Sequence, residues 1–334
     1  TPPPPILSGL VGSEMCIRDS YGELSKKKMD ELLEGARIEV GELKKDPRDF
    51  VLWKSSSDDG VGWDSPWGYG RPGWHIECSA MSTESLGNSF DIHGGGSDLL
   101  FPHHENEIAQ SECATNSKFA NYWLHNGPLR VDDKKMSKSL GNFFTLKEVL
   151  KKHKAEVVRY FLIASHYRSP INYTEQGLQQ SAKALERIYI GLKGLDFENA
   201  KSLTNSRYEK AFLAAMDDDF NTPEACSILF AMVGEINKLK STDSVLAGQL
   251  GKLVVKLGGI LGILTLSPNE FLRRDESVDL DEVIIDGLVA DRNEARKEKN
   301  WARADEIRDQ LLEMKVVVED GNSSSGWRID RQLE

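Results

Sequence analysis

The segment 90–112 constrains the fold of this 334-residue chain most, because a strand, a glycine turn and a helix follow one another directly. Phe90–His93 is typical of a short strand, and Gly94–Asp98 forms a glycine-rich turn. Pro102 suits the first position of a helix, which predicts helix over His103–Glu112. A strand–turn–helix unit belongs to a parallel sheet, whose ligands lie at the carboxyl ends of the strands. The predicted fold class is therefore α/β.

Elsewhere the pattern predicts a helix over Trp74–Leu86 and, after about residue 145, a mostly helical chain. Residues 267–282 are acidic and polar and are typical of a linker. The remaining predicted helices are Lys26–Ala36, Val149–Ser165, Thr174–Leu192, Asn221–Lys240 and Ile284–Met314, and the remaining predicted strands are Phe50–Trp53, Val316–Val318 and Trp327–Ile329.

Composition excludes several classes of protein. An apolar content of 39%, before the 28 glycines are counted, is that of a globular chain. No apolar run reaches the 18 residues of a membrane span. The net charge of −11 means that any nucleic-acid contact needs a local basic patch. The four cysteines are widely spaced, which predicts a reduced, cytoplasmic protein without structural disulfides.

Rare, chemically capable side chains crowd into one part of the chain. Five of the seven histidines and five of the seven tryptophans fall within residues 53–125. This crowding indicates either a functional site or a tryptophan-rich core with incidental histidines.

Two motifs, one after residues 53–125 and one within them, have side chains whose chemistry can be recognised. Lys135-Met136-Ser137-Lys138-Ser139 is a cationic loop that can neutralise the charge growing on a leaving pyrophosphate, although most such loops are only solvated. His103 and Glu107 are four residues apart, so a helix presents both on one face. With Cys78 they would give zinc three ligands and an open fourth position. The alternative is a buried cysteine with a capping histidine.

Four segments together resemble the cysteinyl-tRNA synthetases of class I: Trp74–Cys78, Asp91–Asp98, Phe101–Glu107 and Lys135–Ser139. The resemblance runs from about Tyr21 to near the C-terminus. It implies a partial Rossmann-type nucleotide-binding catalytic domain, a helical bundle and a small C-terminal α/β anticodon-side domain. It further implies ligation of L-cysteine to tRNA(Cys) through a cysteinyl adenylate, with ATP and magnesium as the activating substrate.

The resemblance also implies a role for individual residues. One zinc ion would bind Cys78, His103 and Glu107 and hold the substrate thiolate, which a soft metal prefers to the hydroxyl of serine. The other implied residues are Trp74, His75, His93 and Asp98 for the substrate, Gly95, Gly96 and Lys138 for ATP, and Lys135 with Lys138 for catalysis.

The sequence also departs from the family pattern. The first signature of the family, His-Ile-Gly-His, does not occur, and neither does the N-terminal cysteine that supplies the remaining zinc ligand. Cys16 lies in a foreign-looking leader, residues 1–20, and is not accepted as its replacement. We therefore expect a leader that is artefactual or disordered and a chain that is an N-terminally truncated piece of the enzyme.

A basic stripe near the C-terminus predicts RNA contact. Arg292, Arg296, Lys299 and Arg303 follow spacings of 4, 3 and 4, which places them on one face of a continuous helix that could follow RNA phosphates. Trp327 and Arg328 are further candidates, through base stacking and charge. The alternative is a salt-bridged surface for the stripe and core packing for the tryptophan.

The predicted domains are therefore the catalytic segment 21–145, the helical bundle 146–270 and the anticodon-side segment 283–334. The leading function is a cysteine–tRNA ligase, as a monomer that does not bind membranes. A non-catalytic tRNA-binding remnant and a related small-molecule cysteine ligase remain as alternatives.

Overall fold

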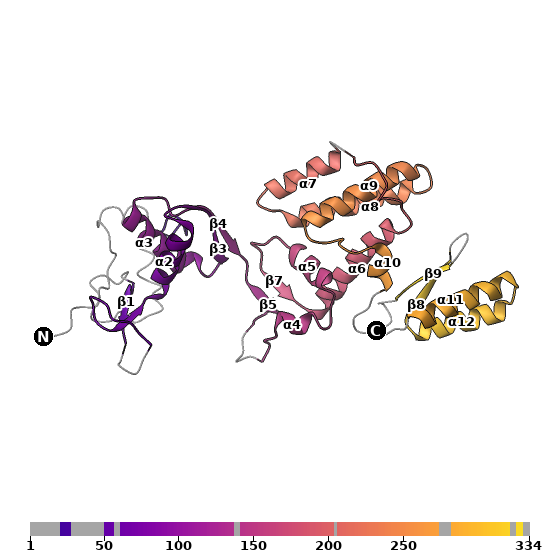
Figure 1. Ribbon diagram of the computed structural model, residues 1–334, viewed down its shortest axis with the longest axis horizontal. Helices are drawn as coiled ribbons and strands as arrows, with labels where there is room; N and C mark the ends of the chain where they lie inside the picture. Colours follow the sequence, from indigo (N-terminus) through magenta and orange to yellow (C-terminus); the bar gives the residue numbers. More distant parts are fainter. Residues whose placement is uncertain are drawn as a thin grey trace. The chain divides into compact units, whose positions relative to one another are not determined.

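The computed structural model describes residues 21–27, 50–56, 61–136, 141–203, 206–273, 282–320 and 325–329. The chain divides into two compact units, Thr1–Pro128 and Leu129–Glu334, which are described separately (Figure 1). The division falls inside the predicted catalytic segment 21–145. The predicted leader, most of the predicted helix Lys26–Ala36 and residue Lys138 lie outside the described residues.

The first unit contains the predicted strand–turn–helix unit. Strand β3 (Phe90–Gly96) pairs in parallel with β4 (Ala120–Asn126), and helix α3 (Glu105–Thr115) connects them. Helix α2 (Trp74–Leu86) has the predicted bounds and packs against α3. Two further strands, β1 (Trp53–Ser55) and β2 (Gly70–Pro72), form an antiparallel pair. The α/β class is thus confirmed.

The start of this helix agrees with its prediction. Phe101 has an extended backbone, with φ −142° and ψ 132°, as the residue before a proline prefers, and the backbone is helical from Pro102 onward. The short helical segment Leu100–His104 leads directly into α3 at Glu105, so His103 lies one turn before Glu107.

Segment 21–27 packs against the first turn of α3. The buried carboxylate of Glu105 accepts hydrogen bonds from the backbone N–H groups of Gly22 (3.0 Å) and Ser25 (2.7 Å). The Tyr21 hydroxyl donates to Asn106 Oδ1 at 2.5 Å. These bonds fix the N-terminal end of α3, from which Glu107 projects.

The second unit begins with a small sheet. Strand β5 (Leu129–Val131) pairs antiparallel with β6 (Lys134–Lys135) and in parallel with β7 (Ile171–Tyr173). The sheet order is therefore β6-β5-β7, which places the first lysine of the basic loop, Lys135, opposite Arg130 on the central strand β5.

A helical bundle follows, with one continuous apolar core. Its two predicted caps are confirmed: Thr174 accepts from Gly177 N at the start of α6, and Asn221 accepts from Glu224 N at the start of α8. The helices are α4 (Leu146–Val149), α5 (Ala155–Ile163), α6 (Glu175–Leu192), α7 (Arg207–Asp217), α8 (Thr222–Leu239), α9 (Ser244–Ile260) and α10 (Pro268–Arg273).

Two predictions for this region are wrong. The predicted helix Val149–Ser165 is interrupted, because the backbone at Lys154 is extended and its buried ammonium donates to the carbonyl oxygen of Phe271 (2.6 Å). The predicted linker 267–282 begins as helix α10, whose Phe271 is fully buried.

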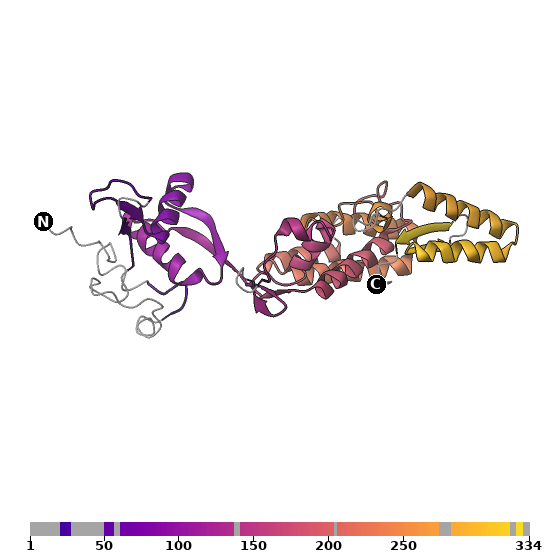
Figure 2. The same ribbon diagram turned by 90° about the horizontal axis from the view of Figure 1, so that it is seen from below.

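The C-terminal part has its own small core around Ile285, Ile307 and Trp327. Helices α11 (Glu282–Lys297) and α12 (Trp301–Glu313) lie antiparallel and side by side (Figure 2). The two predicted strands are present as β8 (Val316–Asp320) and β9 (Ser325–Ile329), and they pair antiparallel. Among all these described residues, no helix is long and apolar enough to cross a membrane.

Candidate metal centre

The structure brings the three predicted zinc ligands together in the first unit. Cys78 comes from α2, His103 from the short helical segment Leu100–His104 that leads into α3, and Glu107 from α3. Their ligand atoms all lie within 4.8 Å of one another. His103 Nε2 and Glu107 Oε1 lie 2.6 Å apart.

Glu107 is the deeply buried carboxylate of this cluster. Its side chain is 1% exposed, and an imidazole nitrogen approaches each of its oxygens: His103 Nε2 lies 2.6 Å from Oε1 and His93 Nε2 lies 2.9 Å from Oε2. His93, His104 and Glu107 form a second group with metal-ligand geometry. Neither imidazole contact is a well-formed hydrogen bond, so the buried carboxylate is poorly satisfied among the described residues, and a bound cation would offset the cost of its burial.

The electrostatics of the other two residues agree with a cation. Burial lowers the pKa of His103, so its ring is neutral at pH 7 and keeps a lone pair for a metal. Burial, with Glu107 beside it, raises the pKa of Cys78, so the thiol keeps its proton unless a cation compensates the charge. The donor set of thiolate, imidazole and carboxylate fits zinc.

Trp74 and His75 surround His103 from the start of α2. The ring centroids of Trp74 and His103 are 4.5 Å apart, and Trp74 is 62% exposed, so it forms an open wall of the site. His75 Nδ1 lies 2.8 Å from His103 Nδ1. This contact orients the His103 ring so that Nε2 faces Glu107, the arrangement by which outer groups fix metal-binding histidines. Burial, with His103 beside it, lowers the pKa of His75 to about 4.

Two further histidines lie beside the cluster and were not singled out from the sequence. His104 is 1% exposed and its Nδ1 lies 2.8 Å from Nε2 of His125 on β4. Burial, with His93 and His125 beside it, lowers the pKa of His104 to about 3. The crowding of histidines in residues 53–125 was the available signal. Their pairing depends on the parallel register of β3 and β4, which the sequence pattern does not show.

The glycines at the end of β3 have a packing role in this structure. A Cβ on Gly95 would lie 3.0 Å from a ring carbon of His104, so a larger residue would require the histidine to shift away from the strand. Asp98 is exposed in the turn that follows Gly96. Contact of Gly95 and Gly96 with ATP and of Asp98 with substrate stays a prediction.

The basic loop belongs to the second unit. Lys135 is exposed at the end of β6, and Lys138 lies outside the described residues. Their catalytic roles stay predictions.

The structure divides the predicted RNA stripe between two helices, so a single continuous face is wrong. Lys299 has a positive φ of 59° in the turn between α11 and α12, and Asn300 caps α12 by accepting from Arg303 N. Arg292 is buried on α11, and Arg296 is half-buried. Lys299 and Arg303 are exposed, and Arg303 pairs with Glu306 at 2.7 Å.

Trp327 and Arg328 are engaged within the protein. Trp327 is 1% exposed and its Nε1 donates to Asp286 at 2.7 Å, so no face of its ring is open for a stacked base. Arg328 pairs with Glu186 of α6 (3.0 Å) and Glu319 of β8 (3.2 Å). The stacking expected for Trp327 is therefore corrected to core packing.

Comparison with known protein families defines the class of this fold and site. Residues 9–183 match the catalytic domain of class I tRNA synthetases of the cysteine type, a match that begins inside the segment 1–20. Residues 211–265 match the DALR domain, and residues 282–328 match the anticodon-binding domain of cysteinyl-tRNA ligases. The chain is thus built as a class I tRNA synthetase.

Individual relatives narrow the assignment. The cysteine–tRNA ligase of Ectopseudomonas mendocina is 56% identical over 93% of this chain and 67% of its own length. The ligase of Azotobacter vinelandii is 55% identical over 93% of this chain and 67% of its own length. The ligase of Pseudomonas aeruginosa is 54% identical over 92% of this chain and 67% of its own length. The chain belongs to the cysteine–tRNA ligase family.

Proposed function

We propose that this chain carries the cysteine-selecting site of a cysteine–tRNA ligase, which activates L-cysteine with ATP as an adenylate and passes it to a terminal hydroxyl of tRNA(Cys). The observation that supports it is the convergence of the ligand atoms of Cys78, His103 and Glu107 within 4.8 Å of one another, with the Glu107 carboxylate buried and in no well-aligned hydrogen bond among the described residues. Family membership supplies the reaction class.

Each residue would have a defined part. Cys78, His103 and Glu107 would hold one zinc ion, which when bound supplies a soft Lewis acid that prefers a thiolate to a hydroxyl. Shape alone separates cysteine poorly from serine, because the two differ by one atom. Trp74 walls the open side of the site, and His75 orients His103.

The activation step uses groups outside this cluster. The cysteine carboxylate oxygen attacks the α-phosphorus of ATP, and the bond to pyrophosphate breaks. Lys135 and Lys138, together with the magnesium of ATP, would neutralise the leaving pyrophosphate. His93, Asp98, Gly95 and Gly96 would border the adenylate at the carboxyl end of β3, where ligands of parallel sheets lie.

The partner would be tRNA(Cys), read through residues 282–328. The exposed Lys299 and Arg303 are the members of the former stripe that remain open to RNA phosphates. Because phosphate contacts release counterions, binding should weaken steeply between two salt concentrations. Charge reversal of Lys299 and Arg303 should weaken it further without unfolding the protein. Equal binding by the reversed protein would contradict this role.

Cobalt substitution tests the selecting site directly. In protein loaded with Co²⁺, cysteine should add a thiolate-to-cobalt absorption band and serine should not. Cys78→Ala and His103→Ala should lower metal content, whereas Cys226→Ala, which removes a buried cysteine of the bundle, should not. With three protein ligands, zinc should be sub-stoichiometric after purification. Full occupancy that Cys78→Ala leaves unchanged would reject the site.

Pyrophosphate exchange tests activation. Because His-Ile-Gly-His does not occur in these 334 residues, we expect no cysteine-dependent ATP–pyrophosphate exchange from the chain alone. Robust exchange would show that this signature is dispensable. In a family member that carries both signatures, the substitution that matches Lys138→Ala should lower kcat by about 10²–10³-fold.

A further inference from the structure

Four charged residues connect the bundle to the C-terminal β-hairpin. Arg328 on β9 places Nη1 3.0 Å from Oε1 of Glu186 on α6 and Nε 3.2 Å from Oε1 of Glu319 on β8. Glu319 Oε2 in turn lies 2.5 Å from Nζ of Lys193, the residue that ends α6. The result is a chain of alternating charge, Glu186–Arg328–Glu319–Lys193, which we call the hairpin clamp.

A second contact lies beside the clamp. The guanidinium of Arg273, at the end of α10, stands 4.8 Å from the ring centroid of Trp327 and 3.9 Å from Asp286 Oδ1. The indole of Trp327 donates to the same Asp286 carboxylate. The hairpin and α11 are thus held to both α6 and α10.

The clamp is better shielded than an ordinary surface ion pair. The side chains of Glu186 and Arg328 are 12% and 23% exposed, whereas those of Arg303 and Glu306 are 47% and 58% exposed. Exposed pairs contribute little to stability, but removing one partner of a shielded pair leaves the other charge uncompensated.

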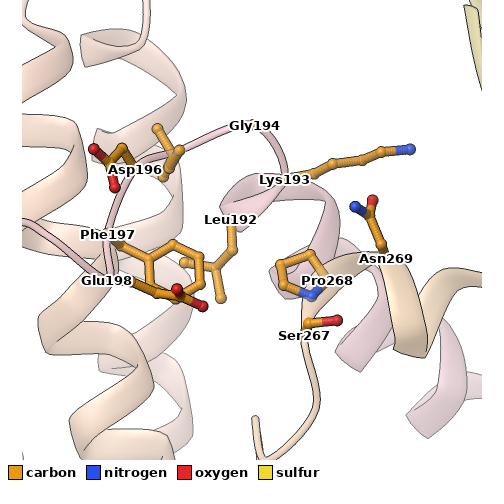
Figure 3. A pocket seen from close by; sticks show the side chains of 10 residues that line it. Leu192, Lys193, Gly194, Asp196, Phe197, Glu198, Ser267, Pro268 and Asn269 are labelled. Atoms are coloured by element: carbon orange, nitrogen blue, oxygen red, sulfur yellow. The ribbon is translucent and has the colours of Figure 1, made fainter.

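Lys193 also has nearby carboxylates with which it does not pair. A cavity of about 320 Å³ is lined by the end of α6, the following loop and the start of α10. Asp196 and Glu198 lie on one side of it, while Lys193 extends away from them on the side of Asn269 (Figure 3). The ammonium of Lys193 is directed to Glu319, so the pairing is a specific one.

We propose that Arg328 and Lys193 are positioning residues for tRNA, which act through the hairpin clamp rather than by touching RNA. In this role, which rests on the proposed function, the clamp holds residues 282–329 in one orientation on the bundle. A long RNA that contacts two parts of a protein binds more tightly when those parts are already oriented, because binding then has less ordering entropy to overcome.

A zero-length carbodiimide cross-link reports the clamp without RNA. The reagent joins an ion-paired ammonium and carboxylate, so mass spectrometry should find an amide between Lys193 and Glu319. Its yield should fall severalfold in Arg328→Glu and in Glu186→Arg. A link between the same two positions should recover in the fourfold variant Glu186→Arg, Arg328→Glu, Glu319→Lys and Lys193→Glu, which restores the alternation with opposite signs. Arg303→Glu, in an exposed pair, should leave the yield unchanged. Absence of this cross-link in the unaltered chain would overturn the proposal.

Affinity for tRNA(Cys) tests the positioning role. Each single variant should bind tRNA severalfold more weakly, and the fourfold variant that reverses every charge of the clamp should regain the original affinity. If Arg328 contacts phosphate itself, the fourfold variant recovers the cross-link but not the affinity, which overturns the positioning role. If the unaltered chain binds no tRNA, the proposed function fails and the positioning role with it. The cross-link then still shows separately whether the clamp forms.

Discussion

The two units differ in how each satisfies a buried carboxylate. In the bundle, Glu156 is 8% exposed and accepts the Tyr189 hydroxyl (2.9 and 3.0 Å) and the N–H of Thr265 (3.1 Å). In the first unit, Glu107 is 1% exposed, and the imidazole nitrogens that approach its oxygens, from His103 (2.6 Å) and His93 (2.9 Å), form no well-aligned hydrogen bond with it. The bundle satisfies its buried charge from its own chain, whereas the first unit presents one that a cation can satisfy.

The largest loss of stability is expected when the hydrogen-bonded carboxylate of the bundle, Glu156, is removed. Glu156→Ala removes the acceptor of two buried donors, so we expect the bundle to lose about 3 kcal/mol of unfolding free energy. Urea denaturation followed by circular dichroism measures this loss. Glu198→Ala, an exposed carboxylate of the same unit, should change stability by less than about 0.5 kcal/mol. Equal effects of the two substitutions would contradict the comparison.

Added zinc should stabilise the first unit, which contains Glu107, and not the bundle. At a free zinc concentration of 100 times Kd, binding contributes about 2.7 kcal/mol to the unit that holds the metal. Hydrogen exchange, read separately for peptides of α3 and of α8, should show added protection in α3 alone. Glu107→Gln should abolish that protection. Equal protection of α8 would mean that zinc acts on the whole chain and not at this cluster.

Acid should weaken the metal-free first unit. The pKa of His75 is lowered to about 4 and that of His104 to about 3, so the unfolded chain takes up these protons near pH 6.5 while the folded unit does not. Stability therefore falls as the pH drops from about 6.5 towards 4. Solvent that reaches the rings reduces the effect, and we expect a loss on the order of 1–2 kcal/mol.

Exchange measured on peptides of the first unit at several pH values, in the presence of a chelator, checks this loss. The double variant His75→Phe with His104→Phe should flatten the dependence. An unchanged slope in that variant would assign the acid sensitivity to other groups.

The smallest effect is expected at the N-terminus of α8, which is capped by Asn221. Asn221→Ala removes the side chain that accepts from Glu224 N, and we expect a loss of about 1 kcal/mol. Asn221→Asp keeps an acceptor and should preserve stability. If Asn221→Ala is neutral in urea denaturation, the cap is replaced by water.

Local signals predicted those parts of the fold that depend on neighbouring residues. The bounds of α2 and the caps at Thr174 and Asn221 follow from glycine, proline and capping side chains within a few positions. Spacing and family resemblance together predicted Cys78, His103 and Glu107, and the structure brings their ligand atoms together.

The features that were missed depend on distant partners. The break before α5 is stabilised by Lys154 reaching Phe271, 117 residues away. The pairing of His104 with His125 depends on strand register. The turn between α11 and α12 is a missed feature with a local cause. Asn300 is a capping residue for a helix start, but the spacing of the basic residues was given more weight and predicted one continuous helix.

The close contacts around Glu107 have a calorimetric consequence. His75 Nδ1 touches His103 Nδ1, His103 Nε2 touches one oxygen of Glu107, and His93 Nε2 touches the other. Burial and the nearby Glu107 raise the pKa of Cys78, so the metal-free thiol keeps its proton, and the heat measured when a metal enters includes the release of that proton. Titrations in buffers of different ionisation enthalpy would count the protons released.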